Sequence, residues 1–195
     1  MNLLFTPQTF SFPGNRVYDP TWIFSHGGTE HPPENNEKAA YGTSPQAGKQ
    51  LNIVMADDDE DDRELFKEAL EKTGRDIHLQ FAEDGKRLID LLSGRATPPD
   101  LIFLDLNMPH KSGLECLTEI RNSALLKHVP VVIYSTSSSM KDVNDTYDHG
   151  ANLYIRKPNS FSELQQISAR VLQLNWNKYT PWNSRSHYLF SSKTE

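Results

Sequence analysis

Carboxylates directly follow two apolar segments of this chain. Asp105 comes after Leu101-Ile102-Phe103-Leu104, and Asp57 and Asp58 come after residues 51–56. A carboxylate at the end of a buried strand is poorly solvated, and carboxylates crowded at one place repel each other unless a cation lies between them. Oxygen ligands without His or Cys indicate a hard ion such as Mg²⁺. The sequence therefore predicts a small acidic pocket that binds Mg²⁺.

A lysine and a hydroxyl group are expected at the same pocket. Lys157 follows the short strand expected at 152–156, and Ser135 follows the apolar residues 131–134. A carboxylate beside a metal ion and a lysine can act as a nucleophile on phosphorus. The metal and the ammonium group neutralise the charge of the transferring phosphoryl group, and a hydroxyl can donate a hydrogen bond to it. These residue types indicate phosphoryl transfer to Asp105.

Alternating strands and helices are predicted to position these side chains. Five strand–helix pairs in strict alternation imply right-handed crossovers and a doubly wound parallel sheet with helices on both faces, an α/β fold. The second strand is the least apolar, which suits an edge. Ligands of such sheets bind at the carboxyl ends of the strands. The expected strands are 51–56, 77–81, 101–104, 131–134 and 152–156, and the expected helices are 61–72, 86–93, 113–120, 140–149 and 161–174.

The expected helix starts carry recognisable capping residues. Ser112 and Ser160 are each followed three residues later by glutamate, which predicts two capping boxes. Asp61 and Asp62 are expected only to favour the N-terminus of the first helix, where negative charge is stabilised. Asp59 is expected to be a solvated loop residue.

Composition limits the classes of partner and compartment. The chain has 195 residues and a net charge of -6, and residues 51–175 carry 21 acidic and 14 basic side chains. This acidic balance argues against direct binding of nucleic acid, which requires a basic surface. No apolar run approaches the roughly 18 residues of a membrane span, and the N-terminus lacks the features of a signal peptide. We therefore expect a cytoplasmic protein without membrane insertion.

Three regions are expected along the chain. Residues 1–50 contain six prolines and no sustained hydrophobic period, so we expect an irregular, disordered leader. Residues 51–175 form the predicted folded domain, and residues 176–195 are expected to be a C-terminal tail. The single cysteine, Cys116, excludes an intramolecular disulfide and is expected to be a small buried hydrophobe on a helix.

Five segments stand in a characteristic order: Asp57-Asp58, residues 104–109 followed by Ser112-Gly113, residues 130–135, Gly150-Ala151 and residues 154–158. Together they resemble the receiver domain of two-component response regulators, from Leu51 to about Leu174. The chain is similar to stand-alone regulators of the kind associated with chemotaxis and phytochromes. The resemblance implies a flavodoxin-like five-stranded sheet of order 2-1-3-4-5.

The resemblance also implies roles for the acidic residues. Asp105 would accept a phosphoryl group from a histidine kinase or a histidine phosphotransfer protein. Asp58 and Asp105 would bind Mg²⁺ directly, together with the backbone carbonyl of Asn107. Asp57 would assist through a water molecule.

The remaining implied roles concern the switch that follows phosphorylation. Lys157 would pair with the phosphoryl group, Ser135 would hydrogen-bond to it, and Tyr154 would move inward with Ser135. The peptide bond before Pro158 would be cis. The surface of the fourth helix, fifth strand and fifth helix would report the state to a downstream protein that the sequence does not identify. The resemblance thus implies a phosphorylation-dependent signalling switch without an output enzyme of its own.

Two other functions remain open as alternatives. A phosphatase with an Asp nucleophile usually carries a second Asp two residues later as a general acid, whereas this chain has Asn107 there. A phosphate-independent adaptor would be expected to have a damaged site. Within the leading hypothesis, Ser135-Thr136-Ser137 allows the hydroxyl position to shift by one residue, although the spacing from Pro130 favours Ser135. His110 is interpreted as an exposed loop residue rather than a base.

Overall fold

The computed structural model describes residues 50–176 and 188–190, so the expected leader lies almost entirely outside the described residues. One parallel sheet has the strand order β2-β1-β3-β4-β5-β6. The strands are β1 (Leu51–Ala56), β2 (Ile77–Ala82), β3 (Leu101–Leu104), β4 (Val131–Ser135), β5 (Leu153–Arg156) and β6 (Leu189–Phe190). The helices are α3 (Glu60–Glu71), α4 (Gly85–Ser93), α5 (Gly113–Asn122), α6 (Met140–Asp148) and α7 (Phe161–Gln173).

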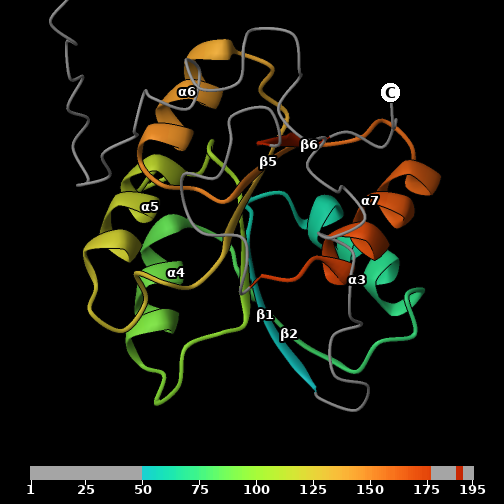
Figure 1. The fold of residues 1–195 in the computed structure, drawn as a ribbon, viewed down its shortest axis with the longest axis horizontal. Coiled ribbons are helices and arrows are strands. Elements are labelled where there is room, and N and C mark those ends of the chain that lie inside the picture. The colour runs from blue at the N-terminus through green and yellow to red at the C-terminus, as the bar shows by residue number, and fades with distance from the viewer. Residues whose placement is uncertain (1–49, 177–187, 191–195) are drawn as a thin grey trace, which may run out of the picture. The chain divides into compact units, whose positions relative to one another are not determined.

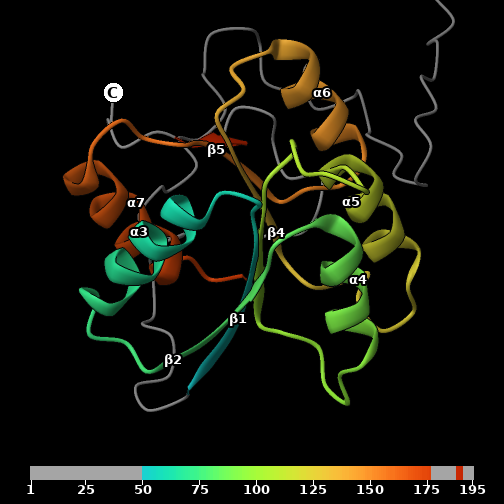
Figure 2. The same cartoon turned by 180° about the vertical axis from the view of Figure 1, so that it is seen from behind.

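Helices cover both faces of the sheet. Figures 1 and 2 show α3 and α7 on one face and α4 and α5 on the other, with α6 beyond α5. Each face has its own apolar layer. Phe66 of α3 and Ile167 of α7 pack with Ile53 and Phe103 on one side, whereas Leu88 of α4 and Leu117 of α5 pack with Val54 on the other. The predicted doubly wound α/β fold and the order 2-1-3-4-5 are confirmed.

The order of the strands explains how deeply each one is buried. All residues of β3 and β4 are buried, because these central strands are covered by helices on both faces. β2 is mostly half-buried and lies at an edge, as its weaker apolar pattern predicts. Since every strand runs in the same direction, the residues that follow β1, β3, β4 and β5 lie along one rim of the sheet.

A sixth strand comes from the segment that the sequence suggests is a tail. Leu189 pairs with Tyr154, and Phe190 pairs with Ile155, in parallel register beside β5. Tyr188 precedes this strand, is almost fully buried and packs against the α4–α5 side of the core. The signal available in the sequence is the short apolar run 188–190 within an otherwise polar stretch, and it is too short to predict a strand.

The helix starts show which capping predictions hold. Ser112 and Glu115 form the reciprocal capping box of α5, as expected. Ser160 caps α7 by accepting a hydrogen bond from the Glu163 amide. Asp59 is exposed in the loop before α3, as expected, and its carboxylate also caps the helix by accepting hydrogen bonds from the amides of the second and third helical residues.

Two further sequence-based expectations concern Cys116 and the membrane. Cys116 is fully buried in α5 near the Gly85 carbonyl, and burial raises the pKa of its thiol to about 11. It therefore behaves as a small hydrophobe, as predicted. Within the described part of the chain, no helix combines the length and the apolar character that crossing a bilayer requires.

Candidate functional site

Strand register brings the predicted site residues to one rim. The Asp57 amide donates to the carbonyl of Ala82 in β2, and the Asp105 amide donates to the carbonyl of Ala56 in β1. The Lys157 amide similarly donates to the Ser135 carbonyl at 2.9 Å. Each site residue is thus held by the backbone of a neighbouring strand, and residues up to 100 positions apart in the chain become neighbours.

The acidic residues form a compact cluster. One carboxylate oxygen from each of Asp57, Asp58 and Asp105 lies within 4.8 Å of the others. Asp57 and Asp105 are buried, whereas Asp58 is exposed to solvent. Asp105 Oδ1 is buried and has no hydrogen-bond partner among the described residues. An unpaired carboxylate oxygen beside two further carboxylates suits a hard divalent cation, so these residues fit Mg²⁺.

Lys157 supplies the positive charge of the pocket. Its Nζ lies 2.8 Å from Asp57 Oδ2, 2.7 Å from Asp62 Oδ2 and 4.0 Å from Asp105 Oδ2. The same atom lies 5.6 Å from the ring centroid of Tyr134, within the range of a cation–π contact. Only 9% of the lysine side chain is exposed. The ammonium group is therefore fixed among carboxylates rather than free in solvent.

Burial and charge shift the protonation equilibria of this pocket in opposite ways. Burial raises the pKa of Asp57 from 3.8 to about 6, although the hydrogen bond and charge of Lys157 oppose the shift. Burial lowers the pKa of Lys157, but its hydrogen bonds to Asp57 and Asp62 outweigh that effect and leave the pKa above 10.5. The lysine stays charged at neutral pH, whereas the ionised form of Asp57 is costly. A cation in the pocket would remove that cost.

A glycine allows the loop after β3 to close beneath the site. Any Cβ at Gly113 would collide with the backbone carbonyl of Asp105, and the Gly113 amide donates to the Leu106 carbonyl at 3.0 Å. The start of α5 therefore packs directly on the backbone that carries Asp105. The side chain of Asn107, whose carbonyl is an expected metal ligand, is exposed in this loop.

The structure separates the three candidate hydroxyl residues after β4. Ser135 is fully buried at the end of the strand, and its Oγ accepts a hydrogen bond from the Ser137 amide at 3.4 Å. Thr136 is exposed. The Ser137 hydroxyl donates to Asp142 of α6 at 2.5 Å. Ser135 is thus the candidate that lies at the rim with a hydroxyl not taken up by a carboxylate.

Tyr154 is buried, and its hydroxyl faces the loop after β4. The hydroxyl donates to the Ser137 carbonyl at 2.9 Å, so the ring lies inward beneath that loop. Burial raises the pKa of the phenol, while its hydrogen bond to Ser137 opposes the shift. The ring also lies near that of Tyr188, with 6.2 Å between centroids. The expected switch residue therefore links the rim to the C-terminal strand.

Asp62 is a site residue that the sequence reasoning missed. It is expected only to stabilise the start of α3, yet its carboxylate forms an ion pair with Lys157. The sequence offers no signal that separates it from Asp61, because both are acids in the first turn of α3. Arg63 also contributes, because its guanidinium donates to the Asp57 carbonyl at 2.7 Å.

Two loop residues complete the comparison with the sequence. No peptide bond among the described residues is cis, so the expected cis bond before Pro158 is wrong for this structure. The trans form is the intrinsically preferred one even before proline, and in that form the loop still directs Lys157 to the acidic cluster. His110 is exposed, as expected, and has a positive φ of 64°.

The chain matches the family model of the response regulator receiver domain over residues 53–169. It is 33% identical to the response regulator Rcp1 of Synechocystis sp. over 117 residues, which cover 57% of this chain and 80% of Rcp1.

Solved structures show the same likeness. The phosphorylated cyanobacterial phytochrome response regulator RcpA is 34% identical, with a TM-score of 0.61 over 67% of this chain and 96% of that chain. The Mn²⁺-bound form of Rcp1 is 29% identical, with a TM-score of 0.60 over 68% of this chain and 99% of that chain. The second structure holds a divalent cation, the kind of ion that the acidic cluster of the present chain fits.

Proposed function

Because the chain belongs to the response regulator receiver domain family, and so carries a two-component signalling switch, we propose that Asp105 is its phosphoacceptor. The phosphoryl group would come from a histidine kinase or a histidine phosphotransfer protein, the kinds of protein with which receiver domains interact. The observation that carries this proposal is the environment of Asp105. Its carboxylate is buried with one unpaired oxygen, beside Asp57, Asp58 and the ammonium group of Lys157.

The reaction is a simple exchange of bonds at phosphorus. A carboxylate oxygen of Asp105 attacks the phosphorus of a phosphohistidine, an O–P bond forms, the N–P bond breaks, and the electron pair returns to the imidazole nitrogen. Attack of water on the acyl phosphate later breaks the O–P bond and releases inorganic phosphate and the free carboxylate. In the domain itself we propose no chemistry beyond the gain and loss of this group.

Each neighbouring residue has a role in this exchange. Asp58, Asp105 and the Asn107 carbonyl would hold Mg²⁺, with Asp57 assisting. The ion would supply positive charge that offsets the charge of the phosphoryl group. Lys157 pairs with a phosphoryl oxygen, and the Ser135 hydroxyl donates a hydrogen bond to another.

The signal would leave the domain through protein contact. A groove of about 330 Å³ runs beside the site and is lined by residues that include Met140, Tyr154, Lys157 and Leu189. The Met140 side chain is 62% exposed, so apolar surface is available there. Movement of Ser135 toward the phosphoryl group would reach this groove through the Ser137 carbonyl that Tyr154 binds. We propose that a downstream protein binds at this surface. We also propose that the protein acts in the cytoplasm, where the histidine kinase obtains its phosphoryl group from ATP.

Labelling with a small phosphoryl donor tests the proposal. Acetyl phosphate with Mg²⁺ should add one phosphoryl group that is stable in mild acid and lost in base, as expected for an acyl phosphate. Asp105→Asn should abolish the label, whereas Asp59→Asn, at a capping residue, should retain it. Equal labelling of Asp105→Asn would show that the acceptor is another residue.

Experiments on the same protein can distinguish the switch from the two alternatives, a phosphatase and a phosphate-independent adaptor. A phosphatase would turn over phosphomonoesters repeatedly, and the residue two positions after Asp105 is Asn107, which cannot act as a general acid. A phosphate-independent adaptor would bind its partner equally as wild type and as Asp105→Asn. The intact set of Asp57, Asp105 and Lys157 around one pocket favours the switch over both.

A further inference from the structure

Lys157 is held by a carboxylate that does not belong to the metal cluster. Its Nζ lies 2.7 Å from Asp62 Oδ2 and 4.0 Å from Asp105 Oδ2. Asp62 is not among the three residues whose oxygens cluster together at the rim. The lysine therefore lies closer to Asp62 than to the residue whose phosphoryl group it is expected to bind.

The start of α3 fixes Asp62 in this place. Asp62 is the third residue of the helix, and its amide donates to the carboxylate of the capping residue Asp59 at 3.3 Å. The Arg63 guanidinium holds the Asp57 carbonyl at 2.7 Å. The Asp62 side chain is 31% exposed. Its ion pair with Lys157 is thus formed from the capped end of a helix, with the Asp62 carboxylate partly exposed.

We propose that Asp62 is a positioning residue that holds the Lys157 ammonium group in the unphosphorylated protein and competes with the Asp105 phosphoryl group for it. The inference rests on the proposed function. A dianionic phosphoryl group on Asp105 gains a charge-assisted hydrogen bond only when Lys157 approaches it. Each such approach loosens or breaks the contact with Asp62, so Asp62 disfavours the phosphorylated state.

If Asp62 competes for Lys157, neutralising Asp62 should stabilise the phosphorylated state. Asp62→Asn should prolong the lifetime of the acyl phosphate and tighten binding of beryllofluoride, a phosphoryl analogue, because Lys157 then has only its ion pair with Asp57 and no longer has to leave Asp62. The contact is partly exposed, and pairs of that kind contribute up to roughly 1 kcal/mol, so the expected change is about two- to fivefold. A purely structural role predicts the opposite sign, a shorter lifetime and weaker binding.

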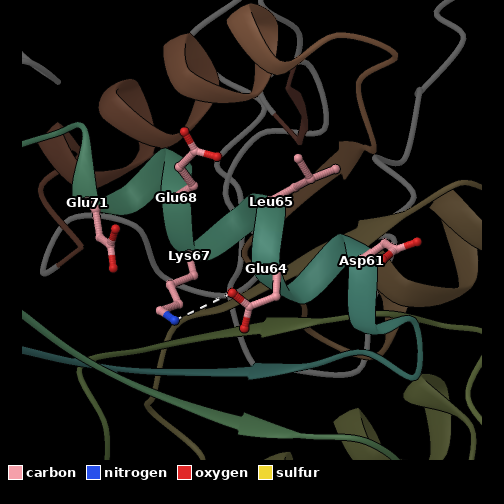
Figure 3. Close-up of a pocket in the computed structure, with 6 residues that line it drawn as sticks. All are labelled: Asp61, Glu64, Leu65, Lys67, Glu68 and Glu71. Carbon is pink, nitrogen blue, oxygen red and sulfur yellow. Dashed lines mark hydrogen bonds and ion pairs between the residues drawn. The ribbon is translucent and has the colours of Figure 1, made fainter.

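A neighbouring acid provides the matched control. Figure 3 shows Asp61 at the start of α3 with its carboxylate directed away from the helix, and Asp61 is exposed. Asp61→Asn removes the same charge from the same helical turn. Both variants should weaken binding of Mg²⁺ alone to a similar small extent, because that effect depends on net charge. Only Asp62→Asn should change the lifetime and the analogue affinity, and Asp62→Glu should restore wild-type values in part.

The experiment uses the full chain. Label from ³²P-acetyl phosphate is followed after donor removal at saturating Mg²⁺, and beryllofluoride affinity is measured by calorimetry under the same conditions. A slower loss of label and tighter analogue binding in Asp62→Asn than in Asp61→Asn would support the inference. Equal values in the two variants, or a faster loss in Asp62→Asn, would overturn it. Should Asp62→Asn not fold, Asp62→Ser serves the same comparison.

Failure of the proposed function has a different signature. In that case wild type itself takes no label and binds no beryllofluoride. If wild type is labelled on Asp105 and the Asp62 variants behave like the Asp61 control, the phosphoacceptor assignment stands and only the role of Asp62 is lost.

Discussion

The domain has two buried polar regions, the acidic pocket around Lys157 and a group of hydroxyls beside α6. They differ in how completely their polar atoms are hydrogen-bonded. In the acidic pocket one ammonium group faces three carboxylates, and Asp105 Oδ1 has no partner among the described residues. Beneath α6, the Tyr188 hydroxyl donates to Thr146 at 2.8 Å, and the Thr146 hydroxyl donates to the Asp142 carbonyl at 2.6 Å. We call Tyr188, Thr146 and Tyr154 the hydroxyl cluster.

This difference indicates that the hydroxyl cluster stabilises the fold and that the acidic pocket is suited to bind a ligand. A satisfied buried network stabilises a fold, whereas a partly satisfied one costs free energy until a partner arrives. The hydroxyl cluster joins β6 to α6 and the core. The acidic pocket keeps negative charge that only a cation or a changed protonation state relieves. Substitutions in the hydroxyl cluster should therefore lower the free energy of unfolding, whereas removal of a carboxylate from the acidic pocket should raise it.

The largest expected effect is the loss of the Tyr188 ring. Tyr188→Ala removes a ring that is 3% exposed and lies 5.1 Å from the Tyr147 ring, centroid to centroid. We expect a decrease of about 2–4 kcal/mol in the free energy of unfolding, measured by urea denaturation. Leu189→Ala, at an exposed neighbour in β6, is the control and should change it by about 0.5 kcal/mol or less. Equal effects would show that Tyr188 is not part of the core.

Neutralising Asp57 should act in the opposite direction. The carboxyl has a pKa of about 6 in the fold and 3.8 outside it, so the folded state binds more protons between these values. The contribution of Asp57 to the stability of the metal-free protein should therefore fall as pH rises from about 4 to about 6 and stay low above that range. Asp57→Asn should raise the unfolding free energy at pH 7 by about 1–3 kcal/mol.

Urea denaturation at pH values from 4 to 8, with a chelator present to remove metal ions, measures how Asp57 affects the free energy of unfolding. The part of the pH dependence that comes from Asp57 should disappear in Asp57→Asn, while Asp59→Asn should keep it. If the free energy of unfolding changed with pH between 4 and 6 in the same way in wild type and in Asp57→Asn, the raised pKa assigned to Asp57 would be contradicted.

Mg²⁺ should offset the cost of the acidic pocket. Binding to the folded state alone stabilises it by about 1.4 kcal/mol when the free ion is at roughly ten times its Kd. A thermal melt with and without Mg²⁺ should show this gain in wild type, a smaller gain in Asp58→Asn, and an unchanged gain in Tyr188→Phe. If Asp58→Asn gained as much as wild type, Asp58 would not be a ligand.

The smallest expected effect isolates one hydrogen bond of the hydroxyl cluster. Tyr188→Phe keeps the ring and removes the donor to Thr146, whose hydroxyl retains its own acceptor, the Asp142 carbonyl. We expect a loss of about 1 kcal/mol in urea denaturation. A loss as large as that of Tyr188→Ala would mean that the hydroxyl, rather than the ring, holds β6 in place.

The site was predictable where local pattern and chemistry coincide. Asp57, Asp105, Ser135 and Lys157 each follow a strand whose apolar run is visible in the sequence, and parallel strands carry such residues to one rim. Asp62 was missed because nothing local distinguishes it from Asp61, since both are acids in the first turn of a helix. Only the packing of α3 against the loop after β5 selects which of the two meets Lys157.

The sequence by itself determined the alternation of strands and helices, the layered α/β fold and the acidic rim, because periodicity and charge act over a few residues. The tertiary structure decided the partner of Lys157 and the docking of Tyr188–Phe190 beside β5. Those features depend on contacts between residues far apart in the chain. Their free energy arises only when the packed elements bring the groups within hydrogen-bonding distance.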